Sequence, residues 1–157
     1  MRIIFNDKYL DVLKMEEEKK LKPAAKKAGM TVKSKKKSAV ARAIIRKGSG
    51  HIKINKMSIA AYARGYVKEM LLEPIRLAGD VIKEYDIDIN VNGSGFMSRA
   101  VAARACIAKA IVKAKGKKYR DLFTAYDRTL LVDDVRRVES KKPLGRKARK
   151  QRQHSKR

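Results

Sequence analysis

Apolar and polar residues alternate along three short stretches of this chain. The alternation is strict in residues 51–55 and 86–91, where isoleucine and valine share one face, and imperfect in residues 39–47. A period of two is typical of half-buried strands, so all three stretches are predicted to be strands. Gly48, Ser49 and Gly50 predict a turn between the stretches 39–47 and 51–55, which would make residues 39–55 a hairpin.

Other stretches show the apolar spacing of helices. The alanine-rich residues 97–115 predict a long helix that ends at Gly116, and residues 119–125 predict a short helical segment after it. Near the N-terminus, residues 7–21 predict a helix. The lysine-rich residues 22–37 that follow predict a linker.

Two helical pieces are predicted between the strands at 51–55 and 86–91. Ser58 suits an N-cap for a helix that begins near Ile59, Pro74 is predicted to divide the region, and Gly79 to end it. The order strand, strand, helix, helix, strand, helix predicts an α+β fold, a two-layer sandwich of one sheet and one helical layer.

The charge of the chain changes this picture most. Its 157 residues hold 41 Lys and Arg against 16 Asp and Glu, a net charge of +25. Such a chain repels itself unless a polyanion neutralises it, and nucleic acid is the first candidate, before an anionic membrane surface. No stretch approaches the roughly 18 uninterrupted apolar residues of a membrane-spanning helix, and the N-terminus lacks a signal layout, so we expect a soluble cytoplasmic protein.

The excess charge lies mainly in two segments. Residues 31–47 carry a net charge of +7 without an acidic residue, and residues 136–157 carry +10. We therefore expect an N-terminal extension and linker in residues 1–32, a globular RNA-binding domain in 33–135, and an extended basic tail in 136–157. The tail has no apolar face, and when extended it would span on the order of 75 Å.

Catalytic and metal-binding signals are weak. His51 and His154 lie far apart and form no zinc spacing with Cys106, the only cysteine. His51 is interpreted as a surface residue and Cys106 as a small buried apolar residue. Asp133 and Asp134 stand among arginines, which favours local charge pairing. We expect no cofactor, no metal, no small-molecule substrate and no enzymatic activity.

Gly93, Ser94 and Gly95 stand between a predicted strand and the long helix. They lack the third glycine of the dinucleotide-binding fingerprint, because Ser98 occupies that position. The triplet is interpreted as a tight turn that requires positive φ. A second interpretation adds a contact between the start of the helix and an RNA phosphate, and both remain open.

Lysine and arginine clusters are the candidate RNA-binding residues. Lysine binds phosphates as a point charge, and arginine adds bidentate contacts and stacking on bases. The alternatives are a solvated linker for the first cluster and a nuclear-localisation signal for the tail. The candidates are Lys35, Lys36, Lys37, Arg42, Arg99, Arg136, Arg137, Lys141, Lys142, Arg146, Lys147, Arg149, Lys150 and Arg152.

Several motifs, in order along the chain, resemble the small-subunit ribosomal protein S nine family in its archaeal and eukaryotic-type branch. They are SKKKSAVAR at 34–42, GSGHIKIN at 48–55, NGSG at 92–95, YDRTLLVDD at 126–134, RRVESKKP at 136–143 and QHSKR at 153–157. The resemblance covers residues 33–157. This chain differs from the family pattern at Ser94, where glycine is usual, and at Arg99, where glutamine is usual.

The resemblance implies a fold of the ribosomal-protein S-five domain-two-like type with a left-handed βαβ crossover, against the usual handedness. It implies a place in the head of the small ribosomal subunit, in contact with ribosomal RNA and neighbouring head proteins. It also implies that the C-terminal tail reaches the tRNA in the peptidyl site, with Ser155, Lys156 and Arg157 nearest to the tRNA.

Two other classes of protein remain as alternatives. One is a protein subunit of a ribonucleoprotein nuclease, such as the ribonuclease P protein, which shares a similar fold and basic character. Its Arg-Asn-Arg helix motif is absent here, because no asparagine stands between Arg99 and Arg104. The other is a free RNA chaperone or DNA-compacting protein, which would not sediment with the small subunit.

Overall fold

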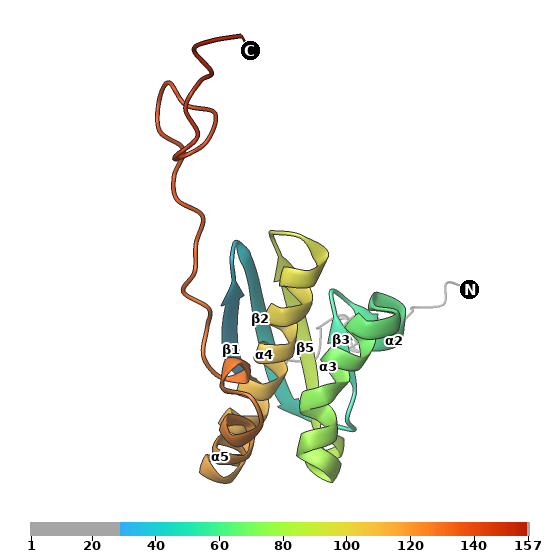
Figure 1. The fold of residues 1–157 in the computed structure, drawn as a ribbon. Helices are drawn as coiled ribbons and strands as arrows, with labels where there is room; N and C mark the ends of the chain where they lie inside the picture. Colours follow the sequence, from blue (N-terminus) through green and yellow to red (C-terminus); the bar gives the residue numbers. More distant parts are fainter. Residues whose placement is uncertain (1–28, 157) are drawn as a thin grey trace, which may run out of the picture.

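Five strands form one mixed sheet in the order β1-β2-β5-β3-β4 (Figure 1). In the computed structural model, which describes residues 29–156, β3 runs parallel to β5 and all other neighbouring strands are antiparallel. The strands are Met30–Lys36 (β1), Ala39–Lys47 (β2), Ile52–Ile54 (β3), Met57–Ser58 (β4) and Tyr85–Asn92 (β5).

The predicted hairpin of residues 39–55 is wrong, although both of its strands exist. β5 lies between β2 and β3, pairing antiparallel with the first and parallel with the second. The inward residues of β5 are Ile87, Ile89 and Val91, each at most 3% exposed. The central place lets this apolar strand bury its inner face and pair along both edges, which a local hairpin would have prevented.

β1 was not predicted, because its residues were assigned to the linker 22–37. All seven of its residues pair with β2, from Met30 opposite Ile45 to Lys36 opposite Ala39. Its inward positions include a polar residue, Ser34, which is 1% exposed and hides the alternation. The predicted helix at 7–21 and the first part of the predicted linker lie outside the described residues.

One layer of helices covers one face of the sheet, which confirms the predicted α+β arrangement (Figure 1). α4 packs on β1, β2 and β5, and α3 packs along α4. The helices are Ile59–Tyr62 (α2), Gly65–Ala78 (α3), Phe96–Lys115 (α4) and Lys117–Tyr126 (α5), with 3-10 helices at Gly79–Glu84 (η1) and Arg128–Leu130 (η2).

The helix boundaries follow the predicted signals, except at Pro74. Ser58 caps α2, its hydroxyl accepting from the Ala61 N–H at 3.4 Å, and Gly79 ends α3 with φ of 62°. Pro74 does not divide the helix. It lies inside α3 with its ring fully buried, and we infer that this packing offsets the hydrogen bond that proline cannot donate.

α4 has a small-residue face that fits closely against the sheet. Its alanines are at most 5% exposed wherever they face inward, and they meet isoleucines from the strands. Phe123 of α5 and Leu130 of η2 close one end of this core and are fully buried. The core is therefore small and aliphatic, as the composition indicates.

Candidate nucleic-acid interface

The basic C-terminal segment is tied to the sheet where it leaves the folded body. Asp133 accepts three hydrogen bonds: from the Ser34 hydroxyl at 2.8 Å, the Lys35 N–H at 3.2 Å and the Lys109 ammonium at 2.6 Å. Burial raises the pKa of Asp133, but the bonds from Lys109, Ser34 and Lys35 outweigh it, and the net pKa lies below its usual range. The carboxylate thus joins β1, α4 and the segment after η2.

Asp134 connects the next residues of the segment to β1. Its carboxylate pairs with Lys36 of β1 and accepts bidentate hydrogen bonds from Arg136, from Nε at 3.0 Å and from NH2 at 2.7 Å. The hydrogen bonds from Arg136 and Lys36 hold the pKa of Asp134 far below its usual range. Arg137 then donates to the Lys37 carbonyl at 2.8 Å, in the turn between β1 and β2.

These contacts lay residues 133–137 along the edge strand β1, as far as its turn with β2 (Figure 1). We call this segment the tail root. Charge pairing at Asp133 and Asp134 was predicted, but from nearby arginines. Of the actual partners only Arg136 is local, while Ser34, Lys36 and Lys109 come from distant parts of the chain.

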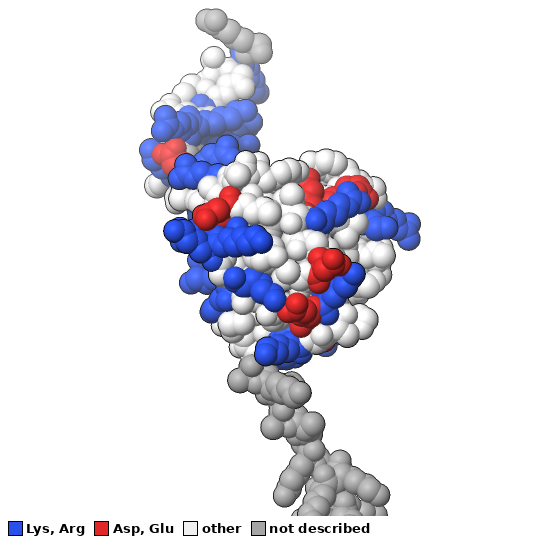
Figure 2. Space-filling model, turned by 90° about the horizontal axis from the view of Figure 1, so that it is seen from below, with Lys and Arg blue, Asp and Glu red and all other residues white. Residues whose placement is uncertain are grey.

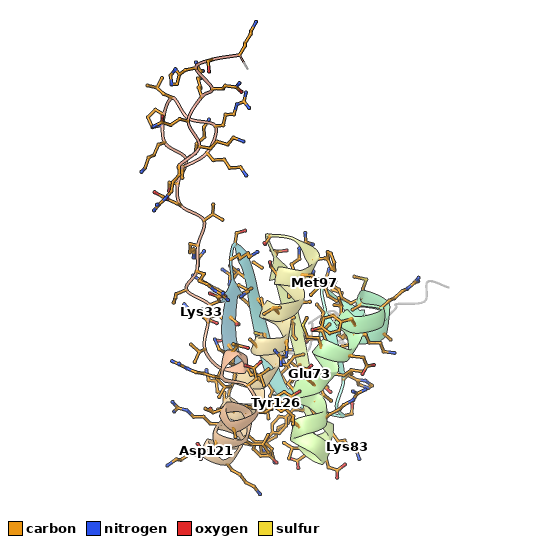
Figure 3. All side chains as sticks on the ribbon, viewed as in Figure 1. Lys33, Glu73, Lys83, Met97, Asp121 and Tyr126 are labelled. Atoms are coloured by element: carbon orange, nitrogen blue, oxygen red, sulfur yellow. The ribbon has the colours of Figure 1, made fainter. Side chains whose placement is uncertain are left out.

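Beyond the root, residues 138–156 contain no helix or strand, and most of their side chains are exposed. Figure 3 shows these side chains projecting away from the folded body. The exposed candidates are Lys141, Lys142, Arg146, Lys147, Arg149, Lys150, Arg152, Ser155 and Lys156, while Arg157 lies outside the described residues.

This part of the tail is not a straight thread. Arg146 donates its backbone N–H to the Lys150 carbonyl at 2.8 Å, which closes a turn. Glu139, its single acidic residue, pairs with Arg149 at 2.9 Å and with Lys142 at 3.4 Å. The turn makes the tail shorter than the expected full extension, while its cations stay exposed.

The turn before α4 has the predicted positive φ. Gly93 has φ of 83° and Ser94 has φ of 52°, and Gly95 is the N-cap without a side-chain hydrogen bond. Arg99 folds back on this turn, donating from Nε to the Gly93 and Ser94 carbonyls at 3.2 Å. Its guanidinium therefore stabilises the turn, a role that the sequence did not reveal.

Lys35, Lys37 and Arg42 are exposed, and Lys35 and Arg42 lie on strands of the sheet. Lys36 is half-buried against Asp134. These three lysines thus have two roles: Lys36 holds the tail root, and Lys35 and Lys37 are exposed to solvent.

The residues weighed for catalysis have ordinary environments. His51 is exposed, and Cys106 is fully buried, where burial is the main cause that raises the pKa of its thiol to about 11. Within residues 29–156, no three His, Cys, Asp or Glu side chains group as metal ligands do. None of the helices described is long and apolar enough to cross a membrane.

Comparison with known proteins identifies the family. The family model described as ribosomal protein S9/S16 matches residues 34–157. Small ribosomal subunit protein uS9 of Picrophilus torridus is 50% identical over 122 residues, covering 77% of this chain and 92% of that protein. The uS9 proteins of Methanococcus vannielii and Thermoplasma volcanium are 42% and 44% identical, over 76% and 77% of this chain and 93% and 92% of their own lengths. The chain therefore belongs to the ribosomal protein S9/S16 family.

Proposed function

We propose that this chain is a structural constituent of the small ribosomal subunit, located in its head and bound to ribosomal RNA and neighbouring head proteins. Its relatives carry the name small ribosomal subunit protein uS9. Membership of a ribosomal protein family argues against the nuclease-subunit alternative, and the chain has no enzymatic role. The cellular location that follows is the cytoplasm, on the ribosome.

The observation that carries this proposal is the contrast between the tail root and the tail beyond it. Asp133 and Asp134 pair with cations of the folded body, so the segment leaves the sheet at a defined place. Beyond the root, residues 138–157 carry a net charge of +8, and most of their described side chains are exposed. A basic segment without a core of its own gains order by neutralising phosphates.

In the proposed arrangement the tail passes through ribosomal RNA to the tRNA in the peptidyl site. Arg136, Arg137 and the cations from Lys141 to Arg152 contact RNA phosphates, which position the chain without reading sequence. Ser155, Lys156 and Arg157 lie nearest to the tRNA. The start of α4 takes part through a phosphate at Gly95, and the crossover from β3 to β5 has the left-handed form of the S-five domain-two-like fold.

The tail hypothesis is tested by removing its last two residues from otherwise complete small subunits. Deletion of Lys156 and Arg157 should weaken tRNA binding at the peptidyl site and leave assembly of the subunit unchanged. The matched control replaces Lys117 and Lys118, two exposed lysines of α5, with alanine. If the truncated and control subunits bind tRNA equally well, the proposed contact between tail and tRNA is wrong.

Sedimentation of cell extracts tests the wider proposal. The protein should migrate with the small subunit and leave no substantial free pool. A free or DNA-bound pool would favour the RNA-chaperone or DNA-compacting alternative.

A further inference from the structure

We propose that the face of the sheet opposite the helices is a second RNA-docking surface, which binds phosphates through a row of cations that crosses the strands. This inference rests on the proposed function, because it names the surface of the folded body that would hold ribosomal RNA. It is independent of the tail and of the tRNA contact.

The row follows from strand register. Lys33 of β1 lies opposite Arg42 of β2, and Arg42 lies opposite Asn90 of β5. Residues that are directly opposite in a sheet share a face, so these three side chains form a line across the strands. All three are exposed, while their sequence neighbours Ser34, Ala41 and Val91 are buried on the helical side.

β3 continues the line. Lys53 lies opposite Asp88, two residues before Asn90 and therefore on the same face of β5. Across the strands, Lys33 and Lys53 are three strand spacings apart, about 14 Å, and the offset of two residues along β5 adds to their separation. This distance is wide enough for more than one phosphate of an RNA strand. The face is also hollowed at this end: Arg42, Lys53, Lys56 and Asn90 line a groove of about 670 Å³.

The acidic groups on this face are already paired. Asp88 accepts from Arg46 at 3.3 Å, and Asp86 accepts from the N–H groups of Ser49 and His51 at 3.0 and 2.9 Å. Among the described residues, no carboxylate pairs with Lys33, Arg42 or Lys53. These cations are therefore available to a ligand that brings negative charge.

The lower end of the molecule has a different charge pattern. Figure 2 shows acidic and basic side chains interspersed there. Lys83, at this end in Figure 3, pairs with Asp80 at 2.5 Å, and Lys115 pairs with Glu84 at 2.6 Å. Mixed charges of this kind are ordinary for a solvated surface.

RNA fits the open face better than an acidic protein segment. Lysine, arginine and asparagine side chains are among the groups that contact phosphate oxygens, and here Lys33, Arg42 and Asn90 stand in one row. Asn90 lines the groove beside its cations, with Ile44 and Ile89 as the apolar part of the lining. Asp88, which also lines the groove, accepts a hydrogen bond from Arg46.

The test removes three cations from the open face of the full-length protein and measures binding to small-subunit ribosomal RNA at several salt concentrations. The variant is Lys33→Ala, Arg42→Ala, Lys53→Ala. Its matched control is Lys117→Ala, Lys118→Ala, Arg120→Ala, which removes two lysines and one arginine from exposed positions of α5. The slope of log affinity against log salt should become shallower by about 2–3 in the first variant and stay nearly unchanged in the control.

Other outcomes would overturn the proposal. Equal slopes in the two variants would show that the open face contributes no specific contact. Normal RNA binding combined with loss of incorporation into the subunit would identify a protein neighbour as the occupant of this face. If the triple variant loses its circular-dichroism signature, the single variant Lys53→Ala should still make the slope shallower by about 0.7–0.9, and an unchanged slope would count against the proposal. A failed tRNA test of the tail would leave all these readouts unaffected.

Discussion

The hydroxyl of Ser34 donates a 2.8 Å hydrogen bond to the carboxylate of Asp133, which lies 99 positions later in the chain. Ser34 is a polar residue on the buried side of the edge strand β1, and it would carry an unsatisfied hydroxyl without this partner. The contact therefore completes the sheet and fixes the tail root at the same time.

Replacement of Asp133 should destabilise the folded body. In Asp133→Ala the Ser34 hydroxyl and the Lys109 ammonium lose their acceptor, which should lower the free energy of unfolding by about 1–3 kcal/mol. Urea unfolding measures the change. The control Asp121→Ala removes an exposed carboxylate of α5 and should change the free energy by less than about 0.5 kcal/mol. Equal effects of the two substitutions would contradict this account of the tail root.

Acid should weaken the same contact. The folded-state pKa of Asp133 is lowered from the ordinary value of 3.8, because the hydrogen bonds from Lys109, Ser34 and Lys35 outweigh burial, the largest single influence, which raises it. A group with a lowered folded-state pKa stabilises the fold fully above its unfolded-state pKa and loses that contribution as the pH falls through the folded-state pKa. The difference in unfolding free energy between the parent and Asp133→Asn should therefore be constant above about pH 5 and shrink below about pH 4. A difference that grows in acid would show the opposite sign of linkage.

The turn before α4 should tolerate a side chain at one glycine and not at another. Gly93 has φ of 83°, and a Cβ there would overlap the Ser38 carbonyl in the β1–β2 turn, whereas Gly95 has φ of −80° and open space around it. Gly93→Ala should cost about 2 kcal/mol or more, because strain and overlap add. Gly95→Ala should cost about 0.5 kcal/mol, since alanine is a poorer N-cap. Thermal unfolding of both variants decides the matter, and equal costs would refute the steric explanation.

The stabilising effect of Arg104 should depend on the shape of its guanidinium as well as on its charge. Arg104 of α4 donates a hydrogen bond to Asp127, the N-cap of η2, at 3.0 Å. It also forms an ion pair with Glu73 of α3 at 2.5 Å, although the two groups are not aligned for a hydrogen bond. Arg104 therefore links α3 and α4 to the start of η2. Arg104→Ala should lower the free energy of unfolding by about 2 kcal/mol, because two half-buried carboxylates lose their partner. Arg104→Lys should recover less than half, since one ammonium does not span both carboxylates. Full recovery by lysine would show that only the charge matters.

Local signals in the sequence predicted the elements well. The alternation of Ile87, Ile89 and Val91 identified β5, and Ser58, Gly79 and Gly116 marked helix ends where the structure has them. These features depend on a few neighbouring residues, through backbone conformation and capping.

Features that depend on distant contacts were missed. Nothing local to residues 39–55 shows that β5 separates their two strands, and the inward Ser34 hides β1 until Asp133 is seen beside it. Pro74 stays within α3 while its ring is packed in the core. The partners of the tail root were missed for the same reason, because Lys36 and Lys109 approach the aspartates only in the folded chain.

The central claim, that the tail reaches peptidyl-site tRNA, is tested most directly by site-specific cross-linking from Ser155. Ser155→Cys supplies an exposed thiol, whereas the natural Cys106 is fully buried with its pKa raised to about 11, so a thiol-directed photoprobe labels position 155. Ala125→Cys, in an exposed position of α5, is the matched control.

In reconstituted small subunits with tRNA in the peptidyl site, the probe at position 155 should cross-link to the anticodon stem-loop of that tRNA. The probe at position 125 should not. Cross-links from position 155 to ribosomal RNA alone, with none to the bound tRNA, would contradict the claim.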